Sequence, residues 1–299
     1  MEEPKRNHPC PCGSGKKYKY CCSPSAINIL GDEIALFHKN RNTAYTGELG
    51  ARREAFCRSY MIKKTEIFKE LSEKQNEMAA SEKSVISCAR GCTHCCILMV
   101  GATVQEVELI VRYLYQNEEL FNYFIDVYPK WISKLKEVDC LLEKQLKNRS
   151  GLSTAAAKEK TKHNCHYLLS ASLDTMWKSG LENRLMIIKE GLYCPFLRDG
   201  ACFIHEVRPY YCAGYFAITP QDWCNPLNAA EYRKRKASQI FKIDLADDLS
   251  FYGGNLEKPV WSFMPVMVYE TLKYGTEALQ PMKIMDGSNM KSYTLKRCL

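Results

Sequence analysis

The sequence has no run of eighteen apolar residues, and residues 1–8 show no apolar segment of the kind found in a secretory signal. It also lacks the spacing of a P-loop, a dinucleotide-binding fingerprint, an H-E-x-x-H zinc protease motif and a Ser–His–Asp set. These absences disfavour a membrane span, secretion, conventional hydrolysis and nucleotide-dependent chemistry. We therefore expect a cytoplasmic protein whose chemistry resides in another group of residues.

Signals for β-strands are sparse as well, whereas helical periodicity is frequent. In residues 25–87, Phe56, Tyr60, Ile67 and Leu71 recur at spacings that give one apolar stripe on a helix. The fold class is therefore predicted to be mainly α. Further helices are expected after a capping box at residues 103–106, over 119–147 with an interruption at Pro129, over 164–190 and over 266–272.

Cysteine, by contrast, is abundant, with 16 residues in a chain of 299. Disulfide scaffolds are usually short, secreted and loop-rich, which does not describe this sequence. Reduced thiols at metal-ligand spacing are typical of zinc or iron–sulfur sites. We therefore interpret the grouped cysteines as metal ligands, and the isolated Cys57, Cys140 and Cys298 as packing or surface residues.

The first group lies in residues 9–22, which follow a C-x-C-x8-C-C pattern with glycine at positions 13 and 15. Two close thiolate pairs joined by a short turn can form a closed tetrahedral zinc site, whose metal would supply the folding energy of so small a segment. This stretch resembles the SEC-C motif found at the C-terminus of the SecA translocation ATPase, where the module contacts a chaperone and the ribosome. The resemblance implies a protein or ribosome contact through residues 1–24, and zinc bound by Cys10, Cys12, Cys21 and Cys22.

Two further blocks are separated by about a hundred residues of expected helix. The C-x2-C spacing of Cys92 and Cys95 lets a turn present two sulfurs to one ion, and Cys88 adds a third from one helical turn earlier. Eight thiolates would satisfy two tetrahedral metals, or one [4Fe–4S] cluster with four thiolates left for another ion or a reactive role. The candidate ligands are Cys88, Cys92, Cys95 and Cys96 in the first block and Cys194, Cys202, Cys212 and Cys224 in the second.

Residues 85–226 resemble the YkgJ-like cysteine-cluster family, also described as a CxxCxxCC zinc- or iron-chelating domain. The order of the cysteines, the Arg208-Pro209 dipeptide before Cys212 and the prolines of the second block carry the resemblance. The sequence departs from the family at Ala213, where arginine is usual, and at His205, where tyrosine is common. The resemblance implies a zinc or iron–sulfur centre in a bacterial protein, without a settled reaction.

These features predict three regions: a zinc module over 1–24, a helical linker over 25–87 and a cysteine-cluster domain over 88–299, with loops pinned by metal. The leading hypothesis is a metal-binding protein. The alternative is an iron–sulfur-dependent redox or protein-modifying enzyme, since a distantly similar cysteine pattern occurs in flagellin lysine N-methylases. A third hypothesis is an adaptor that acts on ribosomes or chaperones through the zinc module.

Several residues near the cysteines have predicted roles other than metal binding. We expect Arg208 to pair with a carboxylate or a carbonyl, with an anion clamp as the alternative, and Tyr210 and Tyr211 to cover the metal site. His94 is interpreted as a rim residue. The net charge of +8 includes a basic run over 233–236, which is typical of a solvated helix face and is also compatible with a nucleic-acid or acidic-protein contact.

Overall fold

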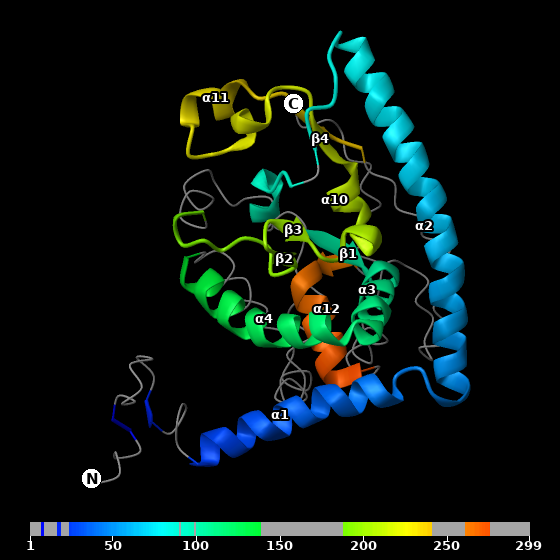
Figure 1. Cartoon of the computed structure of the whole chain (residues 1–299), viewed down its shortest axis with the longest axis vertical. Helices are drawn as coiled ribbons and strands as arrows, with labels where there is room; N and C mark the ends of the chain where they lie inside the picture. The colour runs from blue at the N-terminus through cyan, green and yellow to red at the C-terminus, as the bar shows by residue number, and fades with distance from the viewer. Residues whose placement is uncertain are drawn as a thin grey trace, which may run out of the picture.

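The computed structural model describes residues 7–8, 17–18, 24–89, 91–98, 100–138, 188–240 and 261–275. Within these ranges the chain is mainly α-helical, as the sequence predicts. Two helices, α1 (Pro24–Thr43) and α2 (Gly47–Ser81), border a central group of three others (Figure 1). The central helices are α3 (Val104–Gln116), α4 (Glu118–Val138) and α12 (Met264–Tyr274).

The central group joins segments that lie far apart in the sequence. Strand β1 (Gly101–Thr103) pairs antiparallel with β6 (Trp261–Phe263), and each strand leads directly into a helix, α3 or α12. The amide of Asn40 on α1 donates hydrogen bonds to the carbonyl oxygens of Leu272 and Lys273 on α12, at 3.1 and 2.6 Å. Helix α12 therefore packs between α1 and α3, and it confirms the helix expected over 266–272.

Helix α3 begins at the predicted capping box. The Thr103 hydroxyl accepts the Glu106 N–H at 3.3 Å, and the Glu106 carboxylate accepts the Thr103 N–H at 2.8 Å. These two bonds satisfy orphan donors at the helix start. The apolar face that follows is fully buried and forms the middle of the core: Val107, Ile110, Val111 and Leu114.

Helix α4 differs from its prediction because it continues through Pro129 without a break and ends at Val138. Aromatic packing of the residues before the proline holds the helix in place and outweighs the lost backbone hydrogen bond. Phe124 stacks on Phe196 at 4.4 Å between ring centroids, and Tyr128 stacks on Tyr269 of α12 at 4.1 Å. The helix expected over 164–190 and the last part of 119–147 fall largely outside the described residues.

The second cysteine block consists of short helices and strands. The elements of the block are β2 (Leu197–Arg198), β3 (Ala201–Cys202), η4 (His205–Val207), α10 (Tyr210–Gly214), β4 (Tyr215–Ala217), η5 (Gln221–Cys224), α11 (Ala229–Lys234) and β5 (Ala237–Gln239).

In the described ranges, no helix combines the length and the apolarity that a membrane crossing needs.

Candidate metal centre

The first cysteine block is attached to the second through backbone hydrogen bonds. Cys95 and Cys96 lie in the short helix η2 (His94–Ile97). The carbonyl oxygen of Cys96 accepts the N–H of Cys194 at 2.7 Å, which fixes the start of the second block against the end of the first. Cys88 is held from the other side, since its sulfur accepts the N–H of Ala217 at 3.3 Å.

A tight hairpin places Cys202 next to Cys194. Asp199 and Gly200 both have positive φ, 51° and 74°, which is the backbone of a two-residue turn that matches strand twist. The strands pair Leu197 with Cys202, so the chain reverses directly after Cys194.

The remaining two cysteines stand on short helical turns that other elements hold in position. Cys212 lies within α10, and Gln75 of α2 donates to the carbonyl oxygen of Ala213 at 2.8 Å. Cys224 closes η5, whose Gln221 donates to the Ser87 carbonyl oxygen at 2.6 Å, next to Cys88. Helix α2 and the segment that follows it therefore support both blocks.

The pKa values of the thiols show which cysteines are neighbours. The pKa of Cys224 is raised to about 11 by burial and by the charges of Cys88, Cys92 and Cys95. Thiols charge less readily when they are buried or lie near another negative charge. Cys88, Cys92 and Cys224 therefore form one neighbourhood, and Cys95 adjoins it.

A second neighbourhood surrounds Cys194, whose pKa is raised to about 12 by burial, with contributions from Cys202 and Cys95. Burial likewise raises the pKa of Cys212 well above its ordinary value, and Cys194, Cys95 and Cys202 add to that rise. A hydrogen bond between Cys95 and Cys96 lowers the pKa of Cys95 and raises that of Cys96. Cys95 thus adjoins both neighbourhoods, while Cys96 lies with Cys194 and Cys212.

The eight cysteines converge on one region, but their side chains do not enclose an ion as they stand. Within the described ranges, no group of three or more Cys, His, Asp or Glu side chains is arranged to hold a metal ion. All eight are free thiols, and so is the buried Cys57, which lies apart from them beside Glu108 on α3.

Charged residues buried beside the site were not predicted from the sequence. Lys64 of α2 is fully buried, 3.5 Å from Glu106, and its ammonium lies 4.1 Å from the centre of the Tyr210 ring. Glu106 also accepts the N–H of Tyr210 at 2.6 Å. Lys64 occupies the apolar stripe of Tyr60 and Ile67, and a lysine within a hydrophobic stripe could have indicated a buried ion pair.

A second buried pair lies farther along the same two helices. Arg53 of α2 contacts Glu108 of α3 through two hydrogen bonds of 2.9 and 3.0 Å, in bidentate geometry. Both side chains are almost completely buried. Helices α2 and α3 are therefore joined by charge as well as by apolar contact.

Arg208 has a partner different from the expected carboxylate or carbonyl. One terminal nitrogen of its guanidinium lies 2.7 Å from the ring Nε2 of His205, and its charge is 5.9 Å from the centre of the Phe68 ring. The Nε–H of Arg208 is buried and has no hydrogen-bond partner among the residues that the structure describes. Tyr210 and Tyr211, expected to cover the site, are both buried.

The two histidines of the blocks and the basic run over 233–236 differ in their surroundings. His94 is partly buried within the first block, and His205 is exposed. In the basic run, Lys234 pairs with Glu231 at 3.2 Å and Lys236 with Glu82 at 3.0 Å. Part of the positive charge of this run is therefore neutralised locally.

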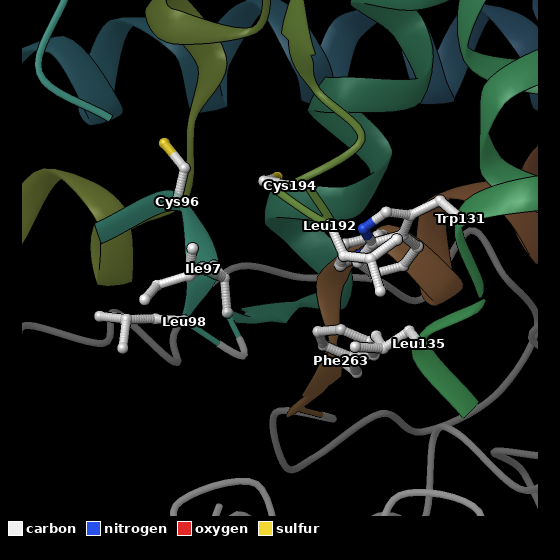
Figure 2. Close-up of a pocket in the computed structure, with 10 residues that line it drawn as sticks. Cys96, Ile97, Leu98, Trp131, Leu135, Leu192, Cys194 and Phe263 are labelled. Atoms are coloured by element: carbon white, nitrogen blue, oxygen red, sulfur yellow. The ribbon is translucent and has the colours of Figure 1, made fainter. Parts of the chain in front are cut away.

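A small apolar pocket adjoins the cysteines on the side of α4. Figure 2 shows Cys96 and Cys194 near one end of it and Leu135 and Phe263 near the other, with Trp131 lying alongside. Its empty volume of about 280 Å³ includes open solvent, so the enclosed part is below the usual range of small-molecule sites. The pocket is therefore a weak candidate for a substrate site.

Comparison with known proteins concerns the N-terminal segment. Residues 6–24 match the SEC-C motif. The chain is 82% identical over 36 residues to the protein translocase subunit SecA of Helicobacter pylori (strain Shi470) and 75% identical over 24 residues to that of Sulfurovum sp. (strain NBC37-1). These stretches are 12% and 8% of this chain and 4% and 3% of the SecA chains, so the likeness is to one short module.

A third relative is the uncharacterized protein YccF of Bacillus subtilis (strain 168), 61% identical over 35 residues, which are 12% of this chain and 10% of YccF. No solved structure matches the chain. The SEC-C match supports a metal-binding N-terminal segment. Its expected ligands Cys10, Cys12, Cys21 and Cys22 lie outside the described residues, and the resemblance of residues 85–226 to the YkgJ-like family stays a prediction.

Proposed function

We propose that this protein is a metal-binding protein with a central centre formed by the eight cysteines of the two blocks and a separate zinc module at its N-terminus. The convergence of thiols from segments about a hundred residues apart in the sequence is the observation that carries the proposal. Soft thiolates gathered in this way select zinc or an iron–sulfur cluster over calcium or magnesium.

The neighbourhoods favour two sets of four ligands. Cys88, Cys92, Cys95 and Cys224 would form one set, because the charges of the first three act on Cys224. The second set would be Cys96, Cys194, Cys202 and Cys212. Each set has the number of thiolates that a tetrahedral zinc ion or a [4Fe–4S] cluster requires. Binding would require the side chains to turn toward a common centre, which rotation about χ1 can supply.

The N-terminal module would serve a different purpose. Its likeness to a SecA segment supports a contact with another protein, and four thiolates within residues 10–22 support a structural zinc site. We propose that residues 1–24 bind a partner protein while the cysteine blocks hold the main metal centre. An iron–sulfur-dependent modification activity, including lysine methyl transfer, remains the alternative if the central centre contains iron.

The test is the content of zinc, iron and acid-labile sulfide per chain, measured on the whole protein purified without oxygen. The proposal expects one zinc for the N-terminal module, plus either two further zincs or about four irons with four sulfides. Cys212→Ser should remove metal from the central centre only, and Cys21→Ser should remove the N-terminal zinc only. Cys57→Ser is the matched control, since Cys57 lies apart from both sites. A metal content unchanged by Cys212→Ser would refute the central site.

A further inference from the structure

The inference concerns the short helix α10, which carries Cys212, and it rests on the proposed metal centre. Both ends of this helix are bonded to side chains of the helical core. At its start, the Tyr210 N–H donates to the carboxylate of Glu106 on α3 at 2.6 Å. At its end, the Ala213 carbonyl oxygen accepts the side-chain amide of Gln75 on α2 at 2.8 Å. A helix of five residues leaves most of its backbone groups without partners inside the helix, so these two bonds help to fix its position.

The two side chains that hold α10 are themselves fixed. Glu106 is completely buried, and one of its carboxylate oxygens accepts the Thr103 N–H at 2.8 Å and the Thr103 hydroxyl at 3.2 Å. The other oxygen lies 3.5 Å from the ammonium of Lys64. Gln75 lies on the buried face of α2 and is 9% exposed. Burial in a close-packed interior leaves both side chains little freedom to move.

Packing around α10 agrees with these two bonds. The ring of Tyr210 meets the ring of Phe68 on α2 edge to face, with 5.7 Å between the centroids. The last residue of the helix, Gly214, accepts the N–H of Ile240 directly after β5, at 2.9 Å. The backbone on both sides of Cys212 is therefore placed by contacts with α2, α3 and the end of β5, all of which are contacts between protein atoms.

We propose that Gln75 and Glu106 are positioning residues of the central metal centre, which hold Cys212 in its binding position in the metal-free chain. Neither side chain binds the metal itself. A ligand that is already in place loses little conformational freedom on binding, so the site has a higher affinity than a mobile loop with the same thiols would have. Helix α2, which the sequence places in a linker, is then a working part of the site.

The experiment centres on Gln75, because its replacement leaves the buried charges in place. Gln75→Met removes the amide donor and keeps the length of the side chain, whereas Gln75→Lys restores a donor that can reach the Ala213 carbonyl oxygen. Tyr45→Phe is the matched control. It removes a hydrogen bond of the same length, 2.8 Å, to Glu108 on α3, away from the two cysteine blocks.

Each full-length protein is stripped of metal, refilled with Co²⁺ and titrated with a competing chelator, while the thiolate–cobalt absorption bands are followed. Gln75→Met is expected to hold cobalt at the central centre about 10-fold more weakly and to shift the bands, because Cys212 has lost its fixed position. Gln75→Lys should recover most of the affinity and the wild-type bands. The N-terminal module should bind cobalt equally in every variant.

Urea unfolding of the same proteins separates positioning from stability. Tyr45→Phe should lose about as much stability as Gln75→Met and still keep the wild-type cobalt affinity and bands. A merely structural role for Gln75 would make the two variants alike in affinity and bands, and that result would overturn the proposal. A Gln75→Met protein equal to the wild type in both would overturn it as well.

Failure of the proposed function would look different. A wild-type chain that takes up a single cobalt, lost on Cys21→Ser and kept on Cys212→Ser, would have no central centre, and the positioning role would fall with it. If Gln75→Met does not fold, judged by its far-UV circular dichroism, Gln75→Asn takes its place, because it keeps the amide but is one methylene too short to reach Ala213. Affinity and bands equal to the wild type in Gln75→Asn would also overturn the positioning role.

Discussion

The carboxylate of Glu106 accepts the backbone N–H of Tyr210 at 2.6 Å, across 104 residues of sequence. The same carboxylate caps helix α3 and faces the buried ammonium of Lys64 on α2. One side chain therefore connects two helices to the turn that bears Cys212. The stability of the helical core and the placement of the second cysteine block depend on the same group.

Loss of the buried ammonium should be costly. Lys64→Met leaves the Glu106 carboxylate buried without its counter-charge, so we expect the free energy of unfolding to fall by about 3–5 kcal/mol. Lys74→Met, which breaks an exposed pair with Glu70, should cost under about 0.5 kcal/mol. Urea unfolding measures both. The double variant Lys64→Met/Glu106→Gln should be less destabilised than the sum of its single changes, and simple additivity would contradict the pairing.

An acid-dependent loss of stability should come from Glu54. Its hydrogen bonds and charge interactions with Arg112 and Arg58 lower the pKa from 4.5 to about 2. Because the folded-state pKa lies below the unfolded one, the ionised carboxylate contributes stability above about pH 4.5, and this contribution is lost as the pH falls toward 2.

Urea unfolding of the wild type and of Glu54→Gln, measured from pH 7 to pH 3, gives the difference in their unfolding free energies. Any loss of bound metal in acid affects both proteins alike, so this difference isolates the contribution of Glu54. We expect the difference to shrink as the pH falls. Asp126→Asn, at an exposed pair with Lys130, serves as control and should show a small difference throughout. A Glu54 difference that is constant with pH would count against the assignment.

The thiols should differ sharply in reactivity. Cys57 is fully buried, and burial raises its pKa above the ordinary value, so an alkylating reagent should leave it unmodified in the folded chain. Cys88 is exposed and should be modified once a chelator has removed any bound metal. Mass spectrometry of the modified peptides gives both rates. Modification of Cys57 only in denaturant is the expected result, and equal rates under native conditions would show that α2 does not pack as described.

Gly214 is needed for a close approach of two chain segments. A Cβ at this position would lie 1.8 Å from the carbonyl oxygen of Ile240, so Gly214→Ala must force the chain after α10 away from β5. We expect a loss of about 1–3 kcal/mol and a lower metal content of the central centre, because Cys212 lies two residues earlier. Urea unfolding and metal analysis test both effects.

Gly200→Ala provides the comparison for Gly214→Ala. Gly200 has a positive φ of 74° and open space around it, so the cost there is backbone strain of about 1 kcal/mol without a collision. The metal content of the Gly200→Ala protein should change less than that of the Gly214→Ala protein. The reverse order would mean that the hairpin after Cys194, rather than the end of α10, controls the geometry of the site.

The local features of this protein follow from its sequence. The capping box at Thr103 and Glu106 and the helix after Met264 depend on short-range chemistry, and both are present as predicted. The cysteine spacing also identified the candidate ligands. The predicted interruption at Pro129 was wrong, because the helix is held by aromatic contacts with Phe196 and Tyr269, which are distant in sequence.

Tertiary structure alone decided how the cysteines are grouped and which charges surround them. Sequence spacing could not separate Cys95 from Cys96, whereas packing places Cys96 near Cys194 and Cys212 and places Cys95 near both Cys224 and Cys212. The burial of Lys64 and the contact of Arg208 with Phe68 depend equally on the way α2 lies against the second block. Burial and long-range electrostatics arise from neighbours that only the folded chain brings together.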